Sequence, residues 1–306
     1  MDNNYVRPTG FNFLPVIVKN ILIINVIMFL ATQALLSRGI DLNDILGLHY
    51  FLSEKFRLWQ FFTYMFMHGN IMHIFFNMFA VYMFGAAMEN IWGPKKFLTY
   101  YLLTGLGAAV AHYAIVYFQM DAAMGTINNY IASPSIDKLQ SLLSSNIFSG
   151  YSSKDFSERL QDFIRTFNET YTTSPSQALN MSVEFMKESR MEVYNAPVVI
   201  GASGALFGLL LAYGMTFPNN FLYVYLILPI KAKYFVIIYG LIELFSGVAN
   251  YSGDNVAHFA HLGGLVTGFI IIKIWDFQKR KNKNNFYQVK ENMQHRRHQA
   301  FYYREK

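Results

Sequence analysis

The segment Ile200-Gly-Ala-Ser-Gly-Ala-Leu-Phe-Gly-Leu-Leu-Leu-Ala-Tyr-Gly-Met-Thr-Phe217 is apolar apart from a serine set between small residues near its start. A second apolar segment, which ends at Trp275, carries His261-Leu-Gly-Gly264. A hydroxyl and an imidazole therefore both lie in stretches suited to lipid. Because neutral imidazole is the usual base that activates a serine, this pairing predicts a nucleophilic site inside a membrane.

The composition of the chain indicates a membrane protein. Only 14% of the 306 residues are charged and 53% are hydrophobic, with 29 Phe and 21 Tyr, whereas about 25% charged residues is usual in soluble domains. The chain has no cysteine, which excludes disulfides, thiol nucleophiles and thiolate metal sites. We therefore predict an integral, multi-pass membrane protein.

Six segments are candidates for membrane crossings, measured against the roughly 20 apolar residues that span a bilayer, although several are short or carry polar residues. We place them at 16–36, 71–91, 97–118, 200–217, 234–249 and 256–275. The run 221–230 is too short to cross and is expected to lie at the membrane interface. A transporter or channel is disfavoured because we find neither internal repeats nor broken helices at the midplane.

Lysine and arginine gather in the connections on one side of these crossings, which the positive-inside rule assigns to the cytoplasm. We expect both termini on that side, the loop 251–255 outside, and the chain in the inner membrane of a bacterium. Cytoplasmic anchoring charge explains most of the net charge of +6. Anionic lipid accounts for the basic tail, so we expect no nucleic-acid partner. The charges that set this orientation are Arg7, Lys19, Lys95, Lys96, Lys231, Lys233 and the cluster 279–283.

The chain divides into four parts by composition. Residues 1–118 hold the first three crossings, 119–196 a polar outward insert, 197–275 the last three crossings, and 276–306 a basic cytoplasmic tail. Within the insert, the apolar residues of 154–167 fall on one face of a predicted helix. We therefore expect a helical insert that rests on the membrane or on the bundle. The residues of that face are Phe156, Leu160, Phe163 and Phe167.

The predicted topology places the polar candidates at one depth. The fourth and sixth crossings both enter from outside, so Ser203 and His261 lie at similar shallow levels. The second crossing also enters from outside with His73 and Asn77, which share a helix face because they are four residues apart. These two side chains, together with a backbone amide at the start of the fourth helix, offer donors for an oxyanion. Phe207, one turn after the serine, is placed to pack against the imidazole.

An acidic third member of the site is not evident in the sequence. Asp254 lies seven residues before His261, in or next to a loop, and is a poor partner for it. We interpret His112 and Glu243 as residues satisfied by interhelical hydrogen bonds, because no motif pairs them with the site. A Ser-His dyad is the simpler prediction.

These motifs resemble, in order and spacing, those of the rhomboid family of intramembrane serine proteases. They are His68-Gly-Asn-Ile-Met-His73-Ile-Phe-Phe-Asn77, Gly85-x-x-x-Glu89-x-x-x-Gly93, Gly201-Ala-Ser203-Gly204 and His261-Leu-Gly-Gly264-x-x-x-Gly268. The resemblance covers residues 16–275 apart from the insert. It implies an all-α membrane protein, a rhomboid-like bundle of six transmembrane helices with a helical insert between the third and fourth.

The resemblance also implies roles for individual residues. Ser203 would be the nucleophile and His261 the general base, with His73, Asn77 and the Ser203 amide stabilising the oxyanion. Substrates would be single-span or other transmembrane proteins in the lipid bilayer, with no metal or cofactor required, and the fifth helix would act as a gate. The residues expected to line the site are His68, Gly201, Gly204, Phe207 and His258. Those expected to pack the helices are Gly85, Glu89, Gly93, Gly264 and Gly268.

Some alternatives stay open at this point. A non-catalytic rhomboid-like protein that binds or escorts membrane proteins would share the fold. A zinc protease built on the histidines at 68, 73, 258 and 261 is disfavoured, because there is no His-Glu-x-x-His motif and no carboxylate beside them. Where the family often has Trp-Arg, this chain has Trp59-Gln60, which leaves the anchoring of the first outer loop open. The cleavage motif and the oligomeric state are likewise open.

Overall fold

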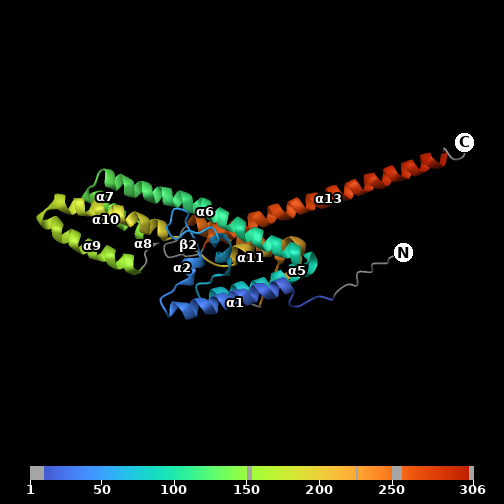
Figure 1. The fold of residues 1–306 in the computed structure, drawn as a ribbon, viewed down its shortest axis with the longest axis horizontal. Helices are drawn as coiled ribbons and strands as arrows, with labels where there is room; N and C mark the ends of the chain where they lie inside the picture. The colour runs from blue at the N-terminus through green and yellow to red at the C-terminus, as the bar shows by residue number, and fades with distance from the viewer. Residues whose placement is uncertain (1–9, 150–153, 225–226, 250–256, 303–306) are drawn as a thin grey trace.

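The structure is a computed structural model that describes residues 10–149, 154–224, 227–249 and 257–302, most of them helical (Figure 1). A helical insert and an apolar bundle follow one another along the long axis of the molecule (Figure 1). The bundle consists of α1 (Val16–Leu36), the continuous segment of α4 (Ile71–Ala80), η2 (Val81–Gly85) and α5 (Ala86–Trp92), α6 (Pro94–Ala132), α11 (Ser203–Thr216), α12 (Ala232–Ala249) and α13 (His258–Tyr302).

Within the described chain, five helical segments are long and apolar enough to cross a membrane. The sixth, α11, is apolar but has only 14 residues. The prediction of an all-α, multi-pass membrane bundle is therefore confirmed. The five long segments are Val16–Leu36, Ile71–Trp92, Pro94–Ala132, Ala232–Ala249 and His258–Lys283.

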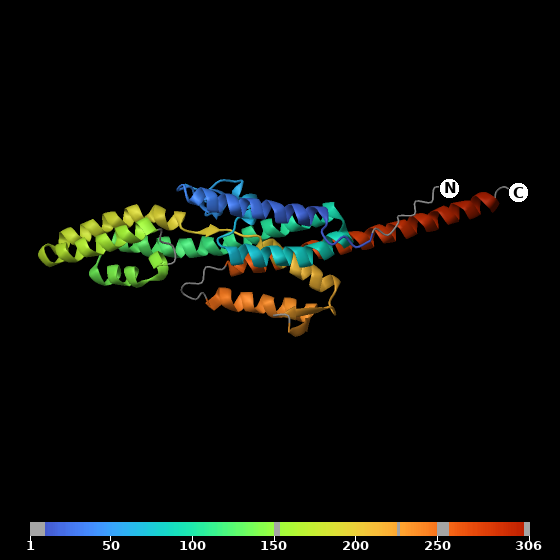
Figure 2. The ribbon, with the colours of Figure 1, turned by 90° about the horizontal axis from the view of Figure 1, so that it is seen from below.

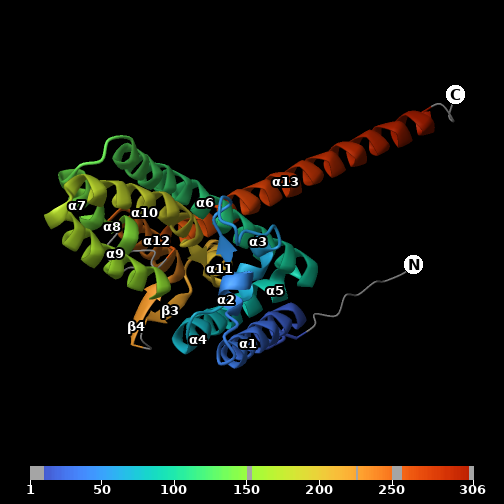
Figure 3. The same ribbon diagram turned by 60° about the vertical axis from the view of Figure 1, so that its left-hand side comes forward.

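Helix α11 is short because it is enclosed by protein. At about 1.5 Å per residue it rises roughly 21 Å, less than the hydrocarbon core of a bilayer. It packs against α6, α12 and α13 and occupies the centre of the bundle (Figure 3). Since its surroundings are side chains, its backbone ends need not match the lipid thickness. By contrast, α1 turns large apolar side chains outward, including Ile27 and Leu30, which are 58% and 61% exposed.

Small residues let α11 and α13 approach at backbone distance. A methyl group built on Gly264 would lie 1.9 Å from the carbonyl oxygen of Gly204. One turn further along α13, a methyl group on Gly268 would lie 2.3 Å from the Tyr100 hydroxyl, which donates to the carbonyl of Gly208. Such contacts are typical of membrane helices, which associate through close packing of small residues.

The insert is a helical unit with its own apolar core. The aromatic face predicted at 154–167 is buried here, since Phe156, Phe163 and Phe167 are at most 7% exposed. These rings pack with apolar residues of α10 and of the C-terminal half of α6. The predicted helical insert thus rests on the bundle through α6. Its helices are α7 (Ile136–Ser144), α8 (Asn146–Ser149), α9 (Lys154–Thr173) and α10 (Pro175–Asn195).

Helix α6 does not end where the third crossing was predicted to end. The sequence becomes polar after Phe118, but the helix runs on without a break to Ala132. Its 39 residues extend about 58 Å, roughly twice the hydrocarbon thickness. Its C-terminal part stays helical because residues such as Met120 and Ile127 are buried against the insert.

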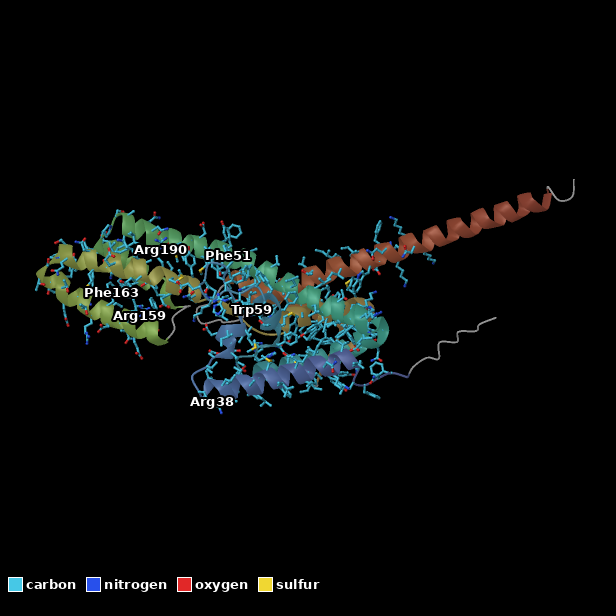
Figure 4. All side chains as sticks on the ribbon, in the orientation of Figure 1. Arg38, Phe51, Trp59, Arg159, Phe163 and Arg190 are labelled. Atoms are coloured by element: carbon cyan, nitrogen blue, oxygen red, sulfur yellow. The ribbon has the colours of Figure 1, made fainter. Side chains whose placement is uncertain are left out.

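The segment between α1 and α4 connects the bundle to the insert. It contains α2 (Leu42–Leu46), β1 (Leu48–His49), α3 (Gln60–Thr63) and η1 (Tyr64–Phe66). Ser53 donates to the side-chain oxygen of Asn195 at the end of α10, at 2.7 Å. Phe51 and Trp59 lie on this segment between the two parts of the molecule (Figure 4) and are 42% and 53% exposed.

Gln60, of the pair Trp59-Gln60, anchors this segment. Its side chain is fully buried and accepts from the amides of His49 and Arg57 at 3.3 and 3.0 Å. Its amide nitrogen donates to the carbonyls of Ile45 and Lys55 at 3.1 and 3.0 Å. A neutral amide therefore ties together the turns on either side of β1.

Helix α12 lies at the edge of the bundle. A hairpin of β3 (Phe221–Val224) and β4 (Leu228–Lys231) connects it to α11, where the sequence predicted an interfacial run (Figure 2). Among the described residues of α12, only Ala232, Val236 and Glu243 are buried. The start of α1 and the C-terminal half of α13 lie at one end of the molecule, and the insert lies at the other (Figure 1).

Glu89 caps the first helix. Its two carboxylate oxygens accept the backbone amides of Ile17 and Val18 at 3.0 and 2.8 Å, and the residue is 4% exposed. The carboxylate thus satisfies amides that no helical carbonyl reaches and lies at the positive end of α1. The two glycines of the same motif have different roles. Gly85 packs beside Val18 of α1, and Gly93 makes the turn into α6 with φ of +78°.

We predict that Gln60→Ala lowers the free energy of unfolding by roughly 1 to 3 kcal/mol, because buried amides and carbonyls around β1 lose their partner. Thermal unfolding of the purified protein in detergent measures this effect. Gln33→Ala, at an exposed position of α1, is the matched control. Equal midpoints for the two variants would contradict the anchoring role.

Glu89→Ala is expected to cost roughly 2 to 4 kcal/mol, since two buried amides lose their acceptor together. The comparison is with Glu188→Ala, which removes an exposed glutamate of the insert. Hydrogen exchange of the first turn of α1 should rise in the Glu89 variant alone. Unchanged protection there would show that α1 does not depend on this cap.

Candidate active site

Ser203 is placed by the chain that precedes it. Strand β2 (Val198–Val199) pairs antiparallel with β1, with Leu48 opposite Val199. The amide of Gly201 then donates to the carbonyl of Tyr64 at 2.8 Å. These backbone contacts hold the segment just before α11, so that Ser203 is the first residue of the helix and its amide lies at the positive end of the helix dipole.

Gly201 is required by conformation and by space. Its φ is +120°, a value that residues with side chains rarely adopt. A methyl group built on it would lie 2.8 Å from Nε2 of His73 and 3.7 Å from Nδ2 of Asn77. The structure therefore brings these two donors from α4 beside the backbone that leads into Ser203.

His261 meets Ser203 directly. Nε2 of the imidazole lies 2.8 Å from the Ser203 Oγ, and the histidine is 8% exposed. The ring of Phe207 stacks on the imidazole, with centroids 4.4 Å apart and planes 9° apart. The two residues chosen from the sequence as nucleophile and base thus form a hydrogen-bonded pair, and the aromatic ring holds the plane of the base.

Glu243 is the member of the site that sequence reasoning missed. Its Oε2 lies 2.9 Å from Nδ1 of His261 and 2.6 Å from Nδ1 of His258. Interhelical hydrogen bonds do satisfy Glu243, as predicted, but they join it to the site, so its separation from the site was a wrong interpretation. The prediction that no carboxylate lies beside the histidines is also wrong. The signal available was depth in the predicted crossings. Glu243 lies a few residues before the end of the fifth crossing, and His261 lies about as many residues after the start of the sixth. The loop 251–255 joins these two ends, so both residues were expected at a similar level. Asp254 lies outside the described residues.

The same cluster has the composition of a metal site. Glu243, His258 and His261 each place one ligand atom within 4.8 Å of the others. The hydrogen bonds from the two rings to the carboxylate already account for these distances. His68 and His73, the other members of the four-histidine alternative, contribute no ligand atom to this set; their rings contact each other at 4.9 Å.

His68 orients Asn77. Nδ2 of Asn77 lies 3.0 Å from Nε2 of His68, and because an amide nitrogen only donates, the imidazole accepts. Burial and, to a lesser extent, His73 lower the pKa of His68 to about 3, so the ring is neutral near pH 7. One N–H of Asn77 is thus used by His68, and the second is left for an oxygen close to Gly201.

Comparison with known proteins identifies the family of the chain. A search of curated proteins finds none that matches the chain. The family model of the Rhomboid domain matches residues 55–128 and 171–275, which include Ser203, His261 and Glu243 and leave out the middle of the insert. Since these residues make up more than half of the chain, it belongs to the rhomboid family.

Proposed function

We propose that this protein is an intramembrane serine endopeptidase that cleaves peptide bonds in or next to transmembrane segments. Members of the family are generally intramembrane serine proteases, although it includes inactive ones. The observation that carries the proposal is the 2.8 Å contact between Ser203 Oγ and His261 Nε2. A binder without catalysis would have no need of an aligned hydroxyl and imidazole.

The reaction follows from this pair. His261 takes the hydroxyl proton through Nε2 while Ser203 Oγ attacks the carbonyl carbon, and the carbonyl oxygen becomes negative. The protonated imidazole then gives its proton to the leaving amine as the C–N bond breaks, which leaves an ester on the serine. A water molecule, deprotonated by the same base, hydrolyses that ester, and the proton returns to Ser203.

In this proposal the oxyanion is stabilised by donors that lie close to the start of α11. The second N–H of Asn77, the His73 ring beside Gly201 and the amide of Ser203 are the groups available. Such preorganised donors act strongly where water is scarce. Because a substrate helix covers its own carbonyls, it must unwind locally before this arrangement can receive one.

In this proposal the site opens to the outer side of the membrane. Lys95 and Lys96 belong to the first turn of α6. The start of α6 lies at the end of the bundle opposite the insert, where α1 begins and from which α13 extends (Figure 1). The positive-inside rule then puts both termini in the cytoplasm. The insert would meet the outer part of single-span or other transmembrane substrates.

We predict that Ser203→Ala and His261→Ala each abolish cleavage of single-span substrates by the protein reconstituted in liposomes, a loss of about 10⁵- to 10⁶-fold in kcat. Ser37→Ala, which removes an exposed hydroxyl at the end of α1, is the matched control. A fluorophosphonate should label Ser203 in the wild type. Cleavage that survives either active-site substitution would refute the proposal, and failure to label would favour the binder.

Asn77→Ala is expected to reduce kcat by roughly ten- to a thousandfold with little change in KM, as for loss of one oxyanion donor. Asn25→Ala is the comparison, since it removes a buried amide on α1 that donates to Ile21. Rates per correctly folded molecule, normalised by thermal unfolding, separate catalysis from stability. An unchanged kcat would remove Asn77 from the oxyanion site.

A further inference from the structure

We infer that Glu243 orients His261 and so completes a Ser203–His261–Glu243 triad, an inference that rests on the proposed protease function. Oε2 of Glu243 lies 2.9 Å from Nδ1 of the ring whose Nε2 lies 2.8 Å from Ser203 Oγ. Each ring nitrogen thus has its own partner. Glu243 acts on the serine through His261 and is therefore a positioning residue.

Two contacts together hold the imidazole. The stacked ring of Phe207 restricts His261 to one plane, but a stacked ring leaves rotation within that plane open. The carboxylate of Glu243 stops this rotation, because it binds Nδ1 at a defined point on the ring edge. With both contacts present, Nε2 is directed at Ser203.

The carboxylate also selects the protonation state that the reaction requires. An ionised carboxylate only accepts hydrogen bonds, so Nδ1 of His261 carries the proton and Nε2 presents its lone pair to Ser203. When Nε2 takes the serine proton, the ring becomes positive next to the negative carboxylate, which stabilises it. The opposite tautomer would present an N–H to the serine and would not act as a base.

Glu243 occupies a costly position that a role in packing does not explain. It is 8% exposed on a helix whose neighbouring residues, Ile242 and Leu244, face outward as lipid-facing side chains do. A carboxylate in such a helix is unfavourable unless it is paired. Here the rings of His258 and His261 share one of its oxygens. His258 thereby fixes the carboxylate from a second direction.

The carboxylate belongs to α12, the helix at the edge of the bundle. Near its outer end, α12 is close to the start of α13 at Gly247, where a methyl group would lie 3.1 Å from the ring of Phe259. Glu243, one turn earlier, supplies the polar contact between the two helices. The base is consequently oriented only while α12 packs against α13.

The test compares Glu243→Gln, Glu243→Asp and wild type in liposomes, with single-span substrate and with a small fluorophosphonate. Glutamine can donate to Nδ1 and stabilise the wrong tautomer, so kcat and the labelling rate should fall by about 10³- to 10⁴-fold while KM is unchanged. Aspartate keeps the negative charge and should recover part of this loss. The His261 Nδ1 proton, observed by NMR in protein with labelled histidine, should disappear in the glutamine variant.

Glu89→Gln is the matched control, because it changes another buried carboxylate that is hydrogen-bonded to α1 and not to the site. It should alter stability without altering the labelling rate of folded protein. Three results would overturn the triad: full kcat in Glu243→Gln, a change confined to KM, or activity that a chelator removes and zinc restores. The last would make the cluster a metal site.

Failure of this inference is distinguishable from failure of the protease proposal. A wild type that neither cleaves nor reacts with fluorophosphonate refutes the protease, and the NMR signal still reports whether Glu243 holds the proton on Nδ1. An active enzyme whose Nδ1 proton is unchanged in Glu243→Gln refutes the positioning role alone.

Discussion

The contact between α11 and α13 at Gly204 and Gly264 is the constraint on which the site depends. Helices that carry ordinary side chains at their interface pack 8 to 10 Å apart, and a hydroxyl on one then stands away from an imidazole on the other. Here the backbones themselves touch, since a methyl group on Gly264 would overlap the Gly204 carbonyl. The short side chain of Ser203 can therefore reach His261 without a movement of either helix.

A second constraint comes from lipid, which offers no hydrogen bonds to polar groups. Two buried side chains meet it with partners at helix ends and turns. Glu89 binds the first amides of α1, and Gln60 binds the turns around β1. The polar groups of the site follow the same rule, because Asn77 is held by His68 and His261 by Glu243. Stability and preorganisation thus have the same physical origin here.

The sequence was informative where one segment carries its own signal. Apolar length located the crossings, and glycine spacing indicated which helices pack closely, as seen at Gly264 and Gly268. The sequence was uninformative where the role of a residue or the end of a helix depends on a partner far along the chain. Glu243 looks isolated until α12 and α13 are placed side by side, and α6 looks finished at Phe118 until the insert covers its polar continuation. The role of Gln60 was hidden for the same reason, since its partners belong to separate turns.

The unbroken course of α6 ties the insert mechanically to the site. From Phe118 to Ala132 the helix advances about 20 Å beyond its predicted crossing, and no proline or glycine pair interrupts it there to provide a hinge. The insert is therefore joined to the bundle by a continuous helix on this side and not by a loop. A protein that contacts both the bundle and the insert would meet them at a spacing set by the length of α6.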